Sequence, residues 1–534
     1  MNGDGWTDLA VLRSDTSASS ASVEVVFSQV SQSTAPLGHA GGFSIRSPNA
    51  FLDVLGADVA ALGDVNGDGF DDLAVGAPYA DTQLWTNNGA VYVVYGKPDD
   101  AAVDLGSPGP AFLTIHGASS ENRIGATLAS AGDLNGDGRR DLFVGAPYAA
   151  QGRGTILGVP VPAAGDVDLA SGGAFFTLTN PTTEFSFMGR TLANAGDQNG
   201  DGRDDLAFSG SASNSDAESV FVQHTPAAGS TIGLGGALSR GSRFDLGASG
   251  TDRPAALRQG MLADAGDQNG DGRHDLAIAG SGTDSLGRRD NGTVFVPFTP
   301  PSGSVVSLDA PLGTAGFSVG GPVDDSGTGT VITALADQNG DGRRDLLVVN
   351  AYALDPAGTR AQVVFAPGPG AAVDLGGGWE GWSMVRSRSG SADVRGATAL
   401  GDLDGDGLDE AALAALPWSL AGPDAYAVTT VVSSFEPRGT TGAATNVTDD
   451  DATVAPNHPL APSVARTVDV QYGPSTTYAA SSAPQSVSPA GTGSASVTAS
   501  LAELTPGTTY HYRVRVRTAA GVVAYGQDST LTTA

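Results

Sequence analysis

The feature that most constrains this chain is an acidic, glycine-rich nonapeptide that occurs seven times. Its clearest copy is DVNGDGFDD at residues 64–72, followed at once by the apolar run LAVGAP. Further full copies begin at Asp133, Asp197, Asp267, Asp337 and Asp402. An incomplete copy, NGDGWTD, begins at Asn2, so the position that the other copies fill with Asp would precede Met1. We interpret this as a truncated or misplaced start of the chain.

The spacing of oxygen donors in the nonapeptide is typical of a loop that binds calcium. Carboxylate or amide oxygens occupy positions 1, 3, 5 and 9, a main-chain carbonyl is available at position 7, and glycines at positions 4 and 6 let the backbone turn with positive φ. An EF-hand would also need a bidentate Glu at position 12, followed by a helix. Position 12 is apolar in every full copy and lies in a short β-prone run. The loops are therefore predicted to lead into strands.

The aligned copies give a set of candidate calcium ligands, in which position 7 contributes only its carbonyl. The set is Asn2, Asp4, Trp6 and Asp8; Asp64, Asn66, Asp68, Phe70 and Asp72; Asp133, Asn135, Asp137, Arg139 and Asp141; Asp197, Asn199, Asp201, Arg203 and Asp205; Asp267, Asn269, Asp271, Arg273 and Asp275; Asp337, Asn339, Asp341, Arg343 and Asp345; Asp402, Asp404, Asp406, Leu408 and Glu410. The alternative is that these are only tight hairpin turns. A turn does not require acids at positions 1, 5 and 9, so we expect up to seven structural calcium ions.

The acidic composition is largely explained by these loops, which hold 21 of the 58 Asp and Glu residues. Seven divalent ions would bring the formal charge from −31 to about −17. The acidity argues against nucleic acid or an anionic membrane as a partner, and Lys97 is the only lysine. The chain has no cysteine and no apolar run long enough to span a membrane. Heavy use of Ala, Gly and Arg suggests a bacterial source.

The copies lie between 64 and 70 residues apart, which indicates one repeated structural unit. Each unit is predicted to contain four short strands, and in the second unit these lie near 57–62, 73–76, 90–95 and 112–116. An aromatic residue recurs in the fourth strand, at Phe43, Phe112, Phe176, Phe244, Phe317 and Trp382. We therefore predict an all-β chain whose residues 1–435 form a seven-bladed β-propeller, its first blade lacking its first strand. The alternative is a linear β-array.

The repeats resemble FG-GAP repeats, the blades of the integrin alpha-chain propeller and of many bacterial surface proteins. The resemblance rests on the pattern GDxNGDGxxDLxVGAP followed by GxVYVVYG, and it covers about residues 1–435. The Phe-Gly pair of the family is replaced here, for example by Leu55 with Gly56, and most integrin-like propellers carry the metal motif in only some blades. No von Willebrand-type insert or leg domain follows, so an animal integrin is not indicated. The resemblance implies an extracellular or surface-attached protein that binds a ligand or mediates adhesion.

The periodicity ends near Phe435, and residues 436–534 are predicted to form a separate β-sandwich. The segment LTPGTTYHYRVRV resembles the fibronectin type III signature, in which Leu504, Pro506 and Tyr510 match the tyrosine corner. The early Trp of that family is absent. Alternation along the strand after Tyr510 predicts one apolar face and one face of arginines. In bacteria such modules resemble spacers.

No catalytic constellation is visible, so we expect a protein that is not an enzyme. The six histidines are scattered and form no HExxH pair, and the chain has neither cysteine nor a GxSxG motif. Carboxylates are abundant, but those of the repeats are already assigned to metal, which weakens the case for a glycosidase.

Strand direction alternates within a blade, so the calcium loops would occupy one rim of the propeller and leave the opposite rim free. Aromatic residues in the connections of that free rim are candidates for ligand binding, namely Tyr79, Trp85, Tyr148, Tyr352 and Trp418. They could equally pack within their own loops. The expected partner is a protein or a glycan. The alternatives are a lectin module or accessory part of a carbohydrate-active enzyme, and a stalk that binds nothing.

Overall fold

Strands account for almost all regular structure in this chain. The computed structural model describes residues 1–3, 7–14, 21–27, 41–47, 55–81, 85–107, 109–181, 185–212, 218–234, 240–246, 261–308, 311–338, 341–350, 360–376, 381–385, 392–401, 409–417, 428–432, 444–454, 457–460, 466–475, 478–487, 493–496, 498–502, 504–518, 523–525 and 529–534. The helical elements in these residues are α2 (Ala149–Gly152), η1 (Leu169–Ser171) and η2 (Gly313–Ala315). No helix in the described ranges is long and apolar enough to cross a membrane.

Seven sheets of short antiparallel strands follow one another up to residue 432. The first contains β1 (Leu9–Ser14), β2 (Ala21–Val26) and β3 (Gly42–Arg46). The second contains β4 (Val59–Gly63), β5 (Asp72–Ala77), β6 (Ala90–Val94) and β8 (Phe112–His116). The third contains β9 (Thr127–Ser130), β10 (Leu142–Ala146), β11 (Thr155–Val159) and β13 (Phe176–Thr179). The four strands predicted for the second unit are confirmed, with their ends within two residues of the predicted ones.

The remaining sheets repeat this order. The fourth contains β14 (Phe185–Ser186), β15 (Leu192–Asn194), β16 (Leu206–Ala212), β17 (Glu218–Gln223) and β19 (Gly241–Leu246). The fifth contains β20 (Leu262–Gly266), β21 (Asp275–Gly280), β22 (Thr293–Pro297) and β24 (Gly316–Gly320). The sixth contains β25 (Thr328–Leu335), β26 (Asp345–Asn350), β27 (Arg360–Val364) and β29 (Gly381–Val385), and the seventh β30 (Ala392–Gly401), β31 (Glu410–Pro417) and β32 (Val428–Val432).

Five of these sheets carry one more short strand, which the following unit contributes in parallel to the last strand of the sheet. These strands are β7 (Val103–Asp104) on β3, β12 (Val167–Asp168) on β8, β18 (Ser230–Gly233) on β13, β23 (Val305–Ser307) on β19 and β28 (Ala372–Asp374) on β24. Each comes from the connection between the third and fourth strands of its own unit. The chain therefore links each sheet to the next at the outer edge and covers an edge that would otherwise be open to pairing.

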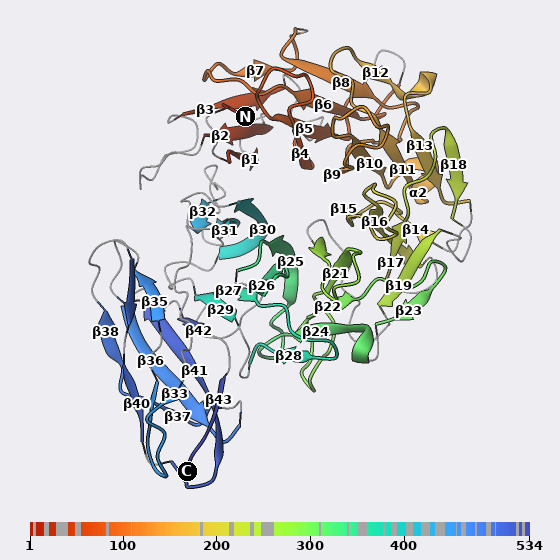
Figure 1. The fold of residues 1–534 in the computed structure, drawn as a ribbon. Coiled ribbons are helices and arrows are strands. Elements are labelled where there is room, and N and C mark those ends of the chain that lie inside the picture. Colours follow the sequence, from red (N-terminus) through yellow and green to blue (C-terminus); the bar gives the residue numbers. More distant parts are fainter. Residues whose placement is uncertain are drawn as a thin grey trace.

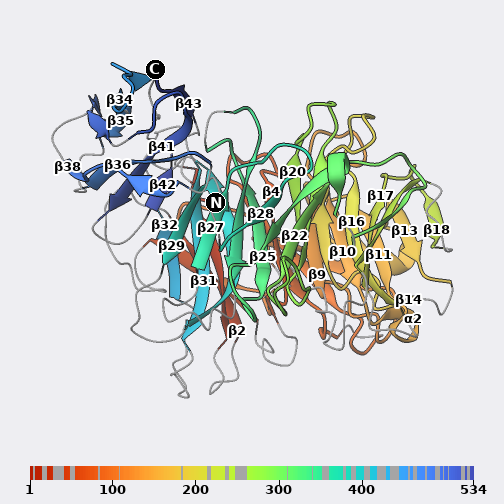
Figure 2. The same ribbon diagram turned by 90° about the horizontal axis from the view of Figure 1, so that it is seen from below.

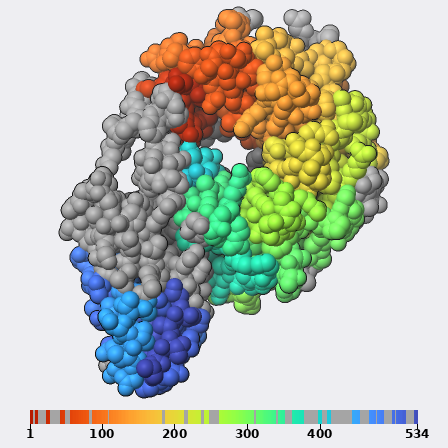
Figure 3. Space-filling view, viewed as in Figure 1, coloured from red at the N-terminus to blue at the C-terminus, as the bar shows by residue number. Residues whose placement is uncertain are grey.

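The sheets follow one another around a central opening (Figures 1 and 3). Their first strands lie side by side near this centre, in the order β4, β9, β15, β20, β25 and β30. The hydrophobic core lies between consecutive sheets, so that Val91 and Leu113 of the second sheet pack in one cluster with Leu142 and Val144 of the third. In a linear β-array, the alternative considered from the sequence, successive sheets would not curve around a centre.

The recurring aromatic residue of the fourth strand is part of this core. Phe43, Phe176, Phe244 and Phe317 are each at most 3% exposed. Phe112 is partly buried, with its ring centroid 5.9 Å from that of Tyr92. The side chain of Trp382 lies outside the described set.

The C-terminal strands form a sandwich-like unit that packs its own core. They are β33 (Ala444–Thr445), β34 (Ala452–Val454), β35 (Asn457–Leu460), β36 (Arg466–Gly473), β37 (Ala480–Ser481), β38 (Gln485–Val487), β39 (Gly493–Ser496), β40 (Ala499–Leu501), β41 (Thr509–Thr518), β42 (Val523–Tyr525) and β43 (Ser529–Thr532). Tyr510 is buried, and its hydroxyl accepts a hydrogen bond from the Thr505 amide at 3.0 Å. Strand β42 also pairs with β29, so the sixth sheet continues into this unit.

The arginine face of β41 is less exposed than alternation alone suggests. Arg513 is buried, and its guanidinium lies 4.2 Å from the ring centroid of Tyr478. Arg515 and Arg517 both pair with the carboxylate of Asp469, which is 1% exposed.

Candidate functional site

Each described acidic loop is closed by its first residue. The Asp64 carboxylate accepts hydrogen bonds from the amides of Gly67, Asp68 and Gly69, at 2.6, 3.1 and 2.8 Å. The same three bonds recur in the loops that begin at Asp133, Asp197 and Asp267. The glycines at positions 4 and 6 have φ between 78° and 91° in these loops, which confirms the predicted turn.

The last residue of each loop ties the loop to the body of its sheet. Asp72 accepts one hydrogen bond from the Val65 amide at 2.9 Å and one from the Gly96 amide at 2.8 Å. Val65 is position 2 of the loop, whereas Gly96 follows the third strand of the sheet. The equivalent pair of bonds recurs at Asp141, Asp205, Asp275 and Asp345. Position 9 therefore fixes the loop on the sheet.

These position 9 carboxylates are the most strongly perturbed acids of the loops. Their side chains are at most 1% exposed, and burial raises their pKa values against the opposing effect of the two amide donors. Charges at positions 1 and 5 of the same loop raise them further. The pKa is about 6 at Asp72, Asp141 and Asp275, about 7 at Asp205 and about 8 at Asp345. None of the five pairs with an arginine, lysine or histidine of the described residues.

Position 5 is shared between the loop backbone and an arginine at position 7. The Asp137 carboxylate accepts a hydrogen bond from the Arg139 amide at 3.0 Å, and the Arg139 side chain returns to it at 2.6 Å. Equivalent ion pairs join Arg203 to Asp201 and Arg343 to Asp341. In the second sheet, position 7 is Phe70, and only its amide donates to Asp68.

The donors of these loops are of the kind that calcium prefers, but carboxylates alone do not form the site. Within the described ranges, no three acidic or histidine side chains are grouped so as to hold a metal ion by themselves. The position 1 carboxylate is turned toward the loop amides, and the Asn66 side-chain oxygen accepts from the Asp68 amide. A cation here would need amide and main-chain oxygens as well, as the motif provides. It would also compensate a buried carboxylate that has only amide donors.

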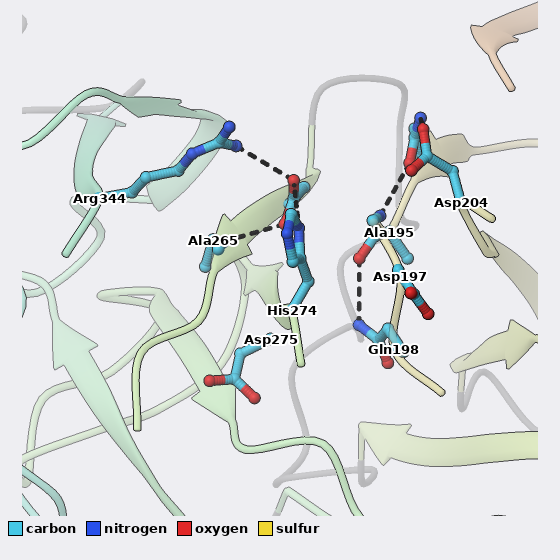
Figure 4. Close-up of polar contacts among 12 residues, drawn as sticks. Ala195, Asp197, Gln198, Asp204, Ala265, His274, Asp275 and Arg344 are labelled. Atoms are coloured by element: carbon cyan, nitrogen blue, oxygen red, sulfur yellow. Dashed lines mark hydrogen bonds and ion pairs between the residues drawn. The ribbon is translucent and has the colours of Figure 1, made fainter. Parts of the chain in front are cut away.

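Position 8, which the sequence did not single out, links neighbouring loops. The His274 amide donates to the Asp197 carbonyl of the preceding sheet at 3.1 Å. Its imidazole pairs with Asp264 at 2.9 Å, and Arg344 of the next sheet binds the same carboxylate at 3.0 Å (Figure 4). The hydrogen bond to Asp264 raises the pKa of His274. Similarly, the Ala336 amide of the sixth sheet donates to the Asp409 carboxylate.

Some predicted ligands are only partly placed. In the incomplete first copy the Asn2 amide donates to Asp8 at 3.0 Å, and the terminal ammonium lies 3.5 Å from the same carboxylate. In the last copy, Glu410 begins β31 and is 1% exposed. The predicted ligands that lie outside the described residues are Asp4, Trp6, Asn339, Asp402, Asp404, Asp406 and Leu408.

On the predicted ligand rim, Tyr79, Trp85 and Tyr148 lie in the connections after β5 and β10, whereas Tyr352 and Trp418 lie outside the described residues. Trp85 is 39% and Tyr148 44% exposed. Two further residues belong with them: the guanidinium of Arg123 lies over the rings of both tyrosines, and the ring of Phe187 contacts Tyr148. Sequence reasoning missed Arg123 and Phe187. Both residues occupy the same place in their repeats, two positions before the recurring glycine, in RIG and FMG.

Two segments of the chain match a known family. Residues 55–94 and 125–157 match the FG-GAP repeat. They cover the first three strands of the second sheet and the beginning of the third, together with both of their acidic loops.

Curated relatives share a short segment with this chain. Integrin alpha-3 of Cricetulus griseus is 41% identical over 93 residues, which is 17% of this chain and 8% of that protein. Phosphatidylinositol-glycan-specific phospholipase D of Mus musculus is 41% identical over 98 residues, 18% of this chain and 11% of that protein. Integrin alpha-PS5 of Drosophila melanogaster is 34% identical over 109 residues, 20% of this chain and 10% of that protein. The chain thus matches about a tenth of the length of these relatives.

Among solved structures, the sensor domain of the anti-sigma factor RsgI4 of Pseudobacteroides cellulosolvens aligns with 18% of this chain and 89% of its own. The sequence identity is 16% and the TM-score 0.15, too low to inform the fold. The family match and the strand order together show an all-β chain with FG-GAP repeats of the propeller type. A segment of this chain is similar in sequence to integrin alpha chains.

Proposed function

We propose that this chain is a calcium-stabilised, seven-bladed FG-GAP propeller followed by a fibronectin type III-like domain. Its role is to bind a protein or glycan ligand, or to mediate adhesion, outside the cell or at its surface. It is not an enzyme. Seven sheets around one centre support the propeller, and the hydrogen bond from Thr505 to the buried Tyr510 hydroxyl supports the C-terminal assignment.

The observation that carries the calcium proposal is the buried carboxylate at position 9. Five such carboxylates occupy equivalent places, each with two amide donors and two further acids in its loop. Bound calcium would balance these charges with oxygens from the carboxylates at positions 1, 5 and 9, the position 3 side chain and the position 7 carbonyl. Because the folded loop binds the ion and the unfolded chain does not, the ion would stabilise the fold by about 2.7 kcal/mol for each loop at a hundredfold excess over Kd.

The test is a thermal unfolding measurement with calcium, with EGTA, and with magnesium in place of calcium. We expect calcium to raise the midpoint by several degrees and EGTA to reverse the shift. Asp68→Asn removes a carboxylate at position 5 and should lower the calcium stoichiometry by one in a titration. The matched control is Asp71→Asn, an exposed acid of the same loop at position 8, which should leave the stoichiometry unchanged. A midpoint that EGTA does not move would reject the calcium proposal.

The comparison with a phospholipase raises the question of catalysis, but the shared segment is only 11% of that protein. The acids of the described loops are engaged by loop amides and, at position 5 of three loops, by arginines. They are therefore better suited to shaping a loop than to acid–base chemistry. Incubation with glycan and phospholipid substrates should give no product, and turnover that Asp72→Asn abolishes would contradict the proposal.

A further inference from the structure

Three sheets present one residue at the same place on the rim that carries α2 and β14, along the lower edge of Figure 2. The residue lies just before the chain enters the next sheet, and its amide donates to a carbonyl in the connection between the second and third strands. In the second sheet the donor is Arg123, bonded to Asn87, and in the third it is Phe187, bonded to Gly152. In the fifth it is Gly327, bonded to Asp290.

The backbone at this place is left-handed in all three sheets, with φ of 52° at Arg123, 54° at Phe187 and 57° at Gly327. Glycine adopts this conformation without strain, and the fifth sheet has glycine. Arginine and phenylalanine adopt it only at a cost, because their Cβ atoms crowd the backbone. Glycine at this place would therefore remove backbone strain from the repeat. The second and third sheets nevertheless carry large side chains there. Strain of this kind is concentrated at functional sites.

A second place on the same rim differs between the sheets in the same way. In each of these sheets, the glycine at the end of the connection between the second and third strands donates a hydrogen bond to a carbonyl near the start of that connection. Gly89 donates to Ala80, Gly154 to Ala149 and Gly292 to Thr283. The second place is the residue just before each of these acceptors. The preceding residues are Tyr79 in the second sheet, Tyr148 in the third and Gly282 in the fifth. The second and third sheets thus have large side chains at both places, where the fifth has glycine at both.

The four large side chains form one continuous surface across the boundary between two sheets, which we call the aromatic rim. The Arg123 guanidinium lies 4.7 Å from the ring centroid of Tyr79 and 5.0 Å from that of Tyr148. The rings of Tyr148 and Phe187 meet edge to face at 6.0 Å. Tyr148 and Phe187 are 44% and 37% exposed, so these contacts leave much of both rings open to solvent.

The aromatic rim is electrically neutral and has polar groups at its border. Glu121 binds the Arg123 side chain at 2.6 Å and so balances its charge. Glu121 also accepts from the Asn87 side chain at 2.9 Å. The chain as a whole carries a formal charge of −31, which disfavours an anionic ligand. The surface therefore combines flat apolar faces with nearby hydrogen-bonding groups, and the charge of Arg123 is balanced by Glu121.

We propose that the aromatic rim binds an uncharged carbohydrate. A pyranose ring has an apolar face that can lie on Tyr148 or Phe187, and hydroxyls that can bond to Glu121, Asn87 and the edge of Arg123. Sites of this design, in which aromatic faces give contact area and a few polar groups fix orientation, are typical of small-ligand recognition. The assignment rests on the proposed ligand-binding role of this rim and names the class of ligand.

The test applies the full chain, with calcium, to an array of neutral and of sialylated oligosaccharides, and then measures the affinity of the best neutral oligosaccharide by titration. We expect binding to neutral glycans, weakened at least tenfold by Phe187→Gly and by Tyr148→Ala. Phe187→Gly keeps the backbone conformation that the site requires, so its loss of binding is not a folding defect. The matched control is Leu286→Ala, which removes an exposed apolar side chain of the fifth sheet and should leave the affinity unchanged.

Three results would overturn this inference: no neutral glycan bound at millimolar concentration, binding confined to sialylated glycans, or equal affinity of the two variants and the native chain. The calcium-dependent shift in thermal midpoint is measured on the same samples. If that shift is present and glycan binding absent, the carbohydrate assignment fails while the calcium-stabilised propeller stands. If the shift is absent as well, the proposed function fails with it.

Discussion

Trp382 and Ala524 are paired in antiparallel register, although one lies in the sixth sheet and the other in the C-terminal unit. The first five sheets end on a short parallel strand from the following unit, whereas the last strand of the sixth, β29, pairs with β42. The C-terminal unit thus covers the edge that a following unit covers elsewhere. A module that the sequence suggested as a spacer is joined to the sixth sheet by main-chain pairing (Figure 1).

This junction predicts a disulfide between two engineered cysteines. Ser383 and Val523 are directly opposed, and such residues have Cβ atoms about 4.5–5.5 Å apart, within reach of a disulfide after small adjustment. Because the native chain has no cysteine, the double variant Ser383→Cys/Val523→Cys contains the only thiols. We expect it to oxidise to a monomeric, cross-linked species, detected as a shift in non-reducing gel mobility.

Two further double variants calibrate this cross-link. Thr467 and Arg517 are opposed within the C-terminal unit, so the corresponding cysteines should also cross-link. Ser529 lies in β43, which pairs with β41 and not with β29 among the described strands, so Ser383→Cys/Ser529→Cys should stay reduced. If the Thr467/Arg517 variant cross-links while Ser383→Cys/Val523→Cys stays reduced, β29 and β42 are not paired in solution.

A second relationship between sheets predicts a pH dependence of stability. Asp58 precedes β4 and accepts a hydrogen bond from Leu128 of β9 at 2.8 Å, so its carboxyl group bridges the second and third sheets. Burial raises its pKa from 3.8 to about 7, against the opposing effect of the Leu128 and Val59 amides. The folded chain therefore holds a proton there that the unfolded chain has already released between about pH 4 and 7. Stability from this group is greatest below pH 4 and falls as the pH rises through that window.

The measurement is chemical denaturation in EGTA between pH 4.5 and 7.5. Full ionisation would cost at most about 4 kcal/mol. Asp58→Asn should flatten the decline relative to the native chain. Thr127 occupies the equivalent place in the third sheet, where its hydroxyl donates to the Gly189 carbonyl. Thr127→Val should lower stability equally at every pH, and parallel curves for native chain and Asp58→Asn would contradict the assignment.

The sequence was sufficient for the repeated parts of this molecule, because periodicity reports backbone structure directly. The described loops with their positive-φ glycines and the strands of the second unit follow from spacing and residue type. The position 8 links, such as His274 with Asp264, could not be predicted from one repeat. They depend on how adjacent sheets are placed, and the residue type at position 8 varies between Thr, Asp, Arg and His.

The candidate ligand rim was only half predictable for a related reason. Tyr79 and Tyr148 stand in the recurring letters GAPYA and were visible as exposed aromatic candidates. Arg123 and Phe187 were not, because nothing in the letters says that their backbone is left-handed or that they meet those tyrosines across a sheet boundary. The edge pairing of β29 with β42 was hidden as well, since it joins residues about 140 positions apart.

Position 7 of the acidic loops predicts different calcium affinities in different sheets. In the third sheet the Arg139 side chain binds the position 5 carboxylate. In the second sheet, with Phe70 at position 7, the Asp68 carboxylate accepts only from neutral donors, the Phe70 amide and the Asn66 side chain. A guanidinium beside the proposed ion repels it and competes for its ligand. Arg139→Leu should therefore tighten calcium binding by roughly threefold to tenfold, in keeping with about 1 kcal/mol for a partly exposed ion pair.

Calorimetric calcium titration of Arg139→Leu, Arg140→Leu and Phe70→Arg checks this expectation. Phe70→Arg should weaken one site by a similar factor. Arg140→Leu is the matched control, because Arg140 is the exposed neighbour at position 8 and has the same charge. If Arg139→Leu weakens binding, the arginine orients the carboxylate instead of competing for it.

The strained backbone at Phe187 makes the final prediction, which concerns stability alone. Replacing Phe187 by Ala or by Gly removes the same ring and the same contact with Tyr148, so the two variants differ only in backbone preference. At an ordinary exposed position Ala is more stable than Gly, because glycine has more conformational freedom to lose on folding. At φ of 54° the Cβ atom of alanine is crowded, which costs about 1–2 kcal/mol.

We therefore expect Phe187→Gly to be more stable than Phe187→Ala by about 1 kcal/mol in denaturant unfolding. Tyr148, exposed on the same rim with φ of −91°, should show the opposite order for its Ala and Gly variants. If both positions favour Ala, the left-handed backbone at Phe187 is not held in solution, and the strain that distinguishes the aromatic rim from the fifth sheet does not exist.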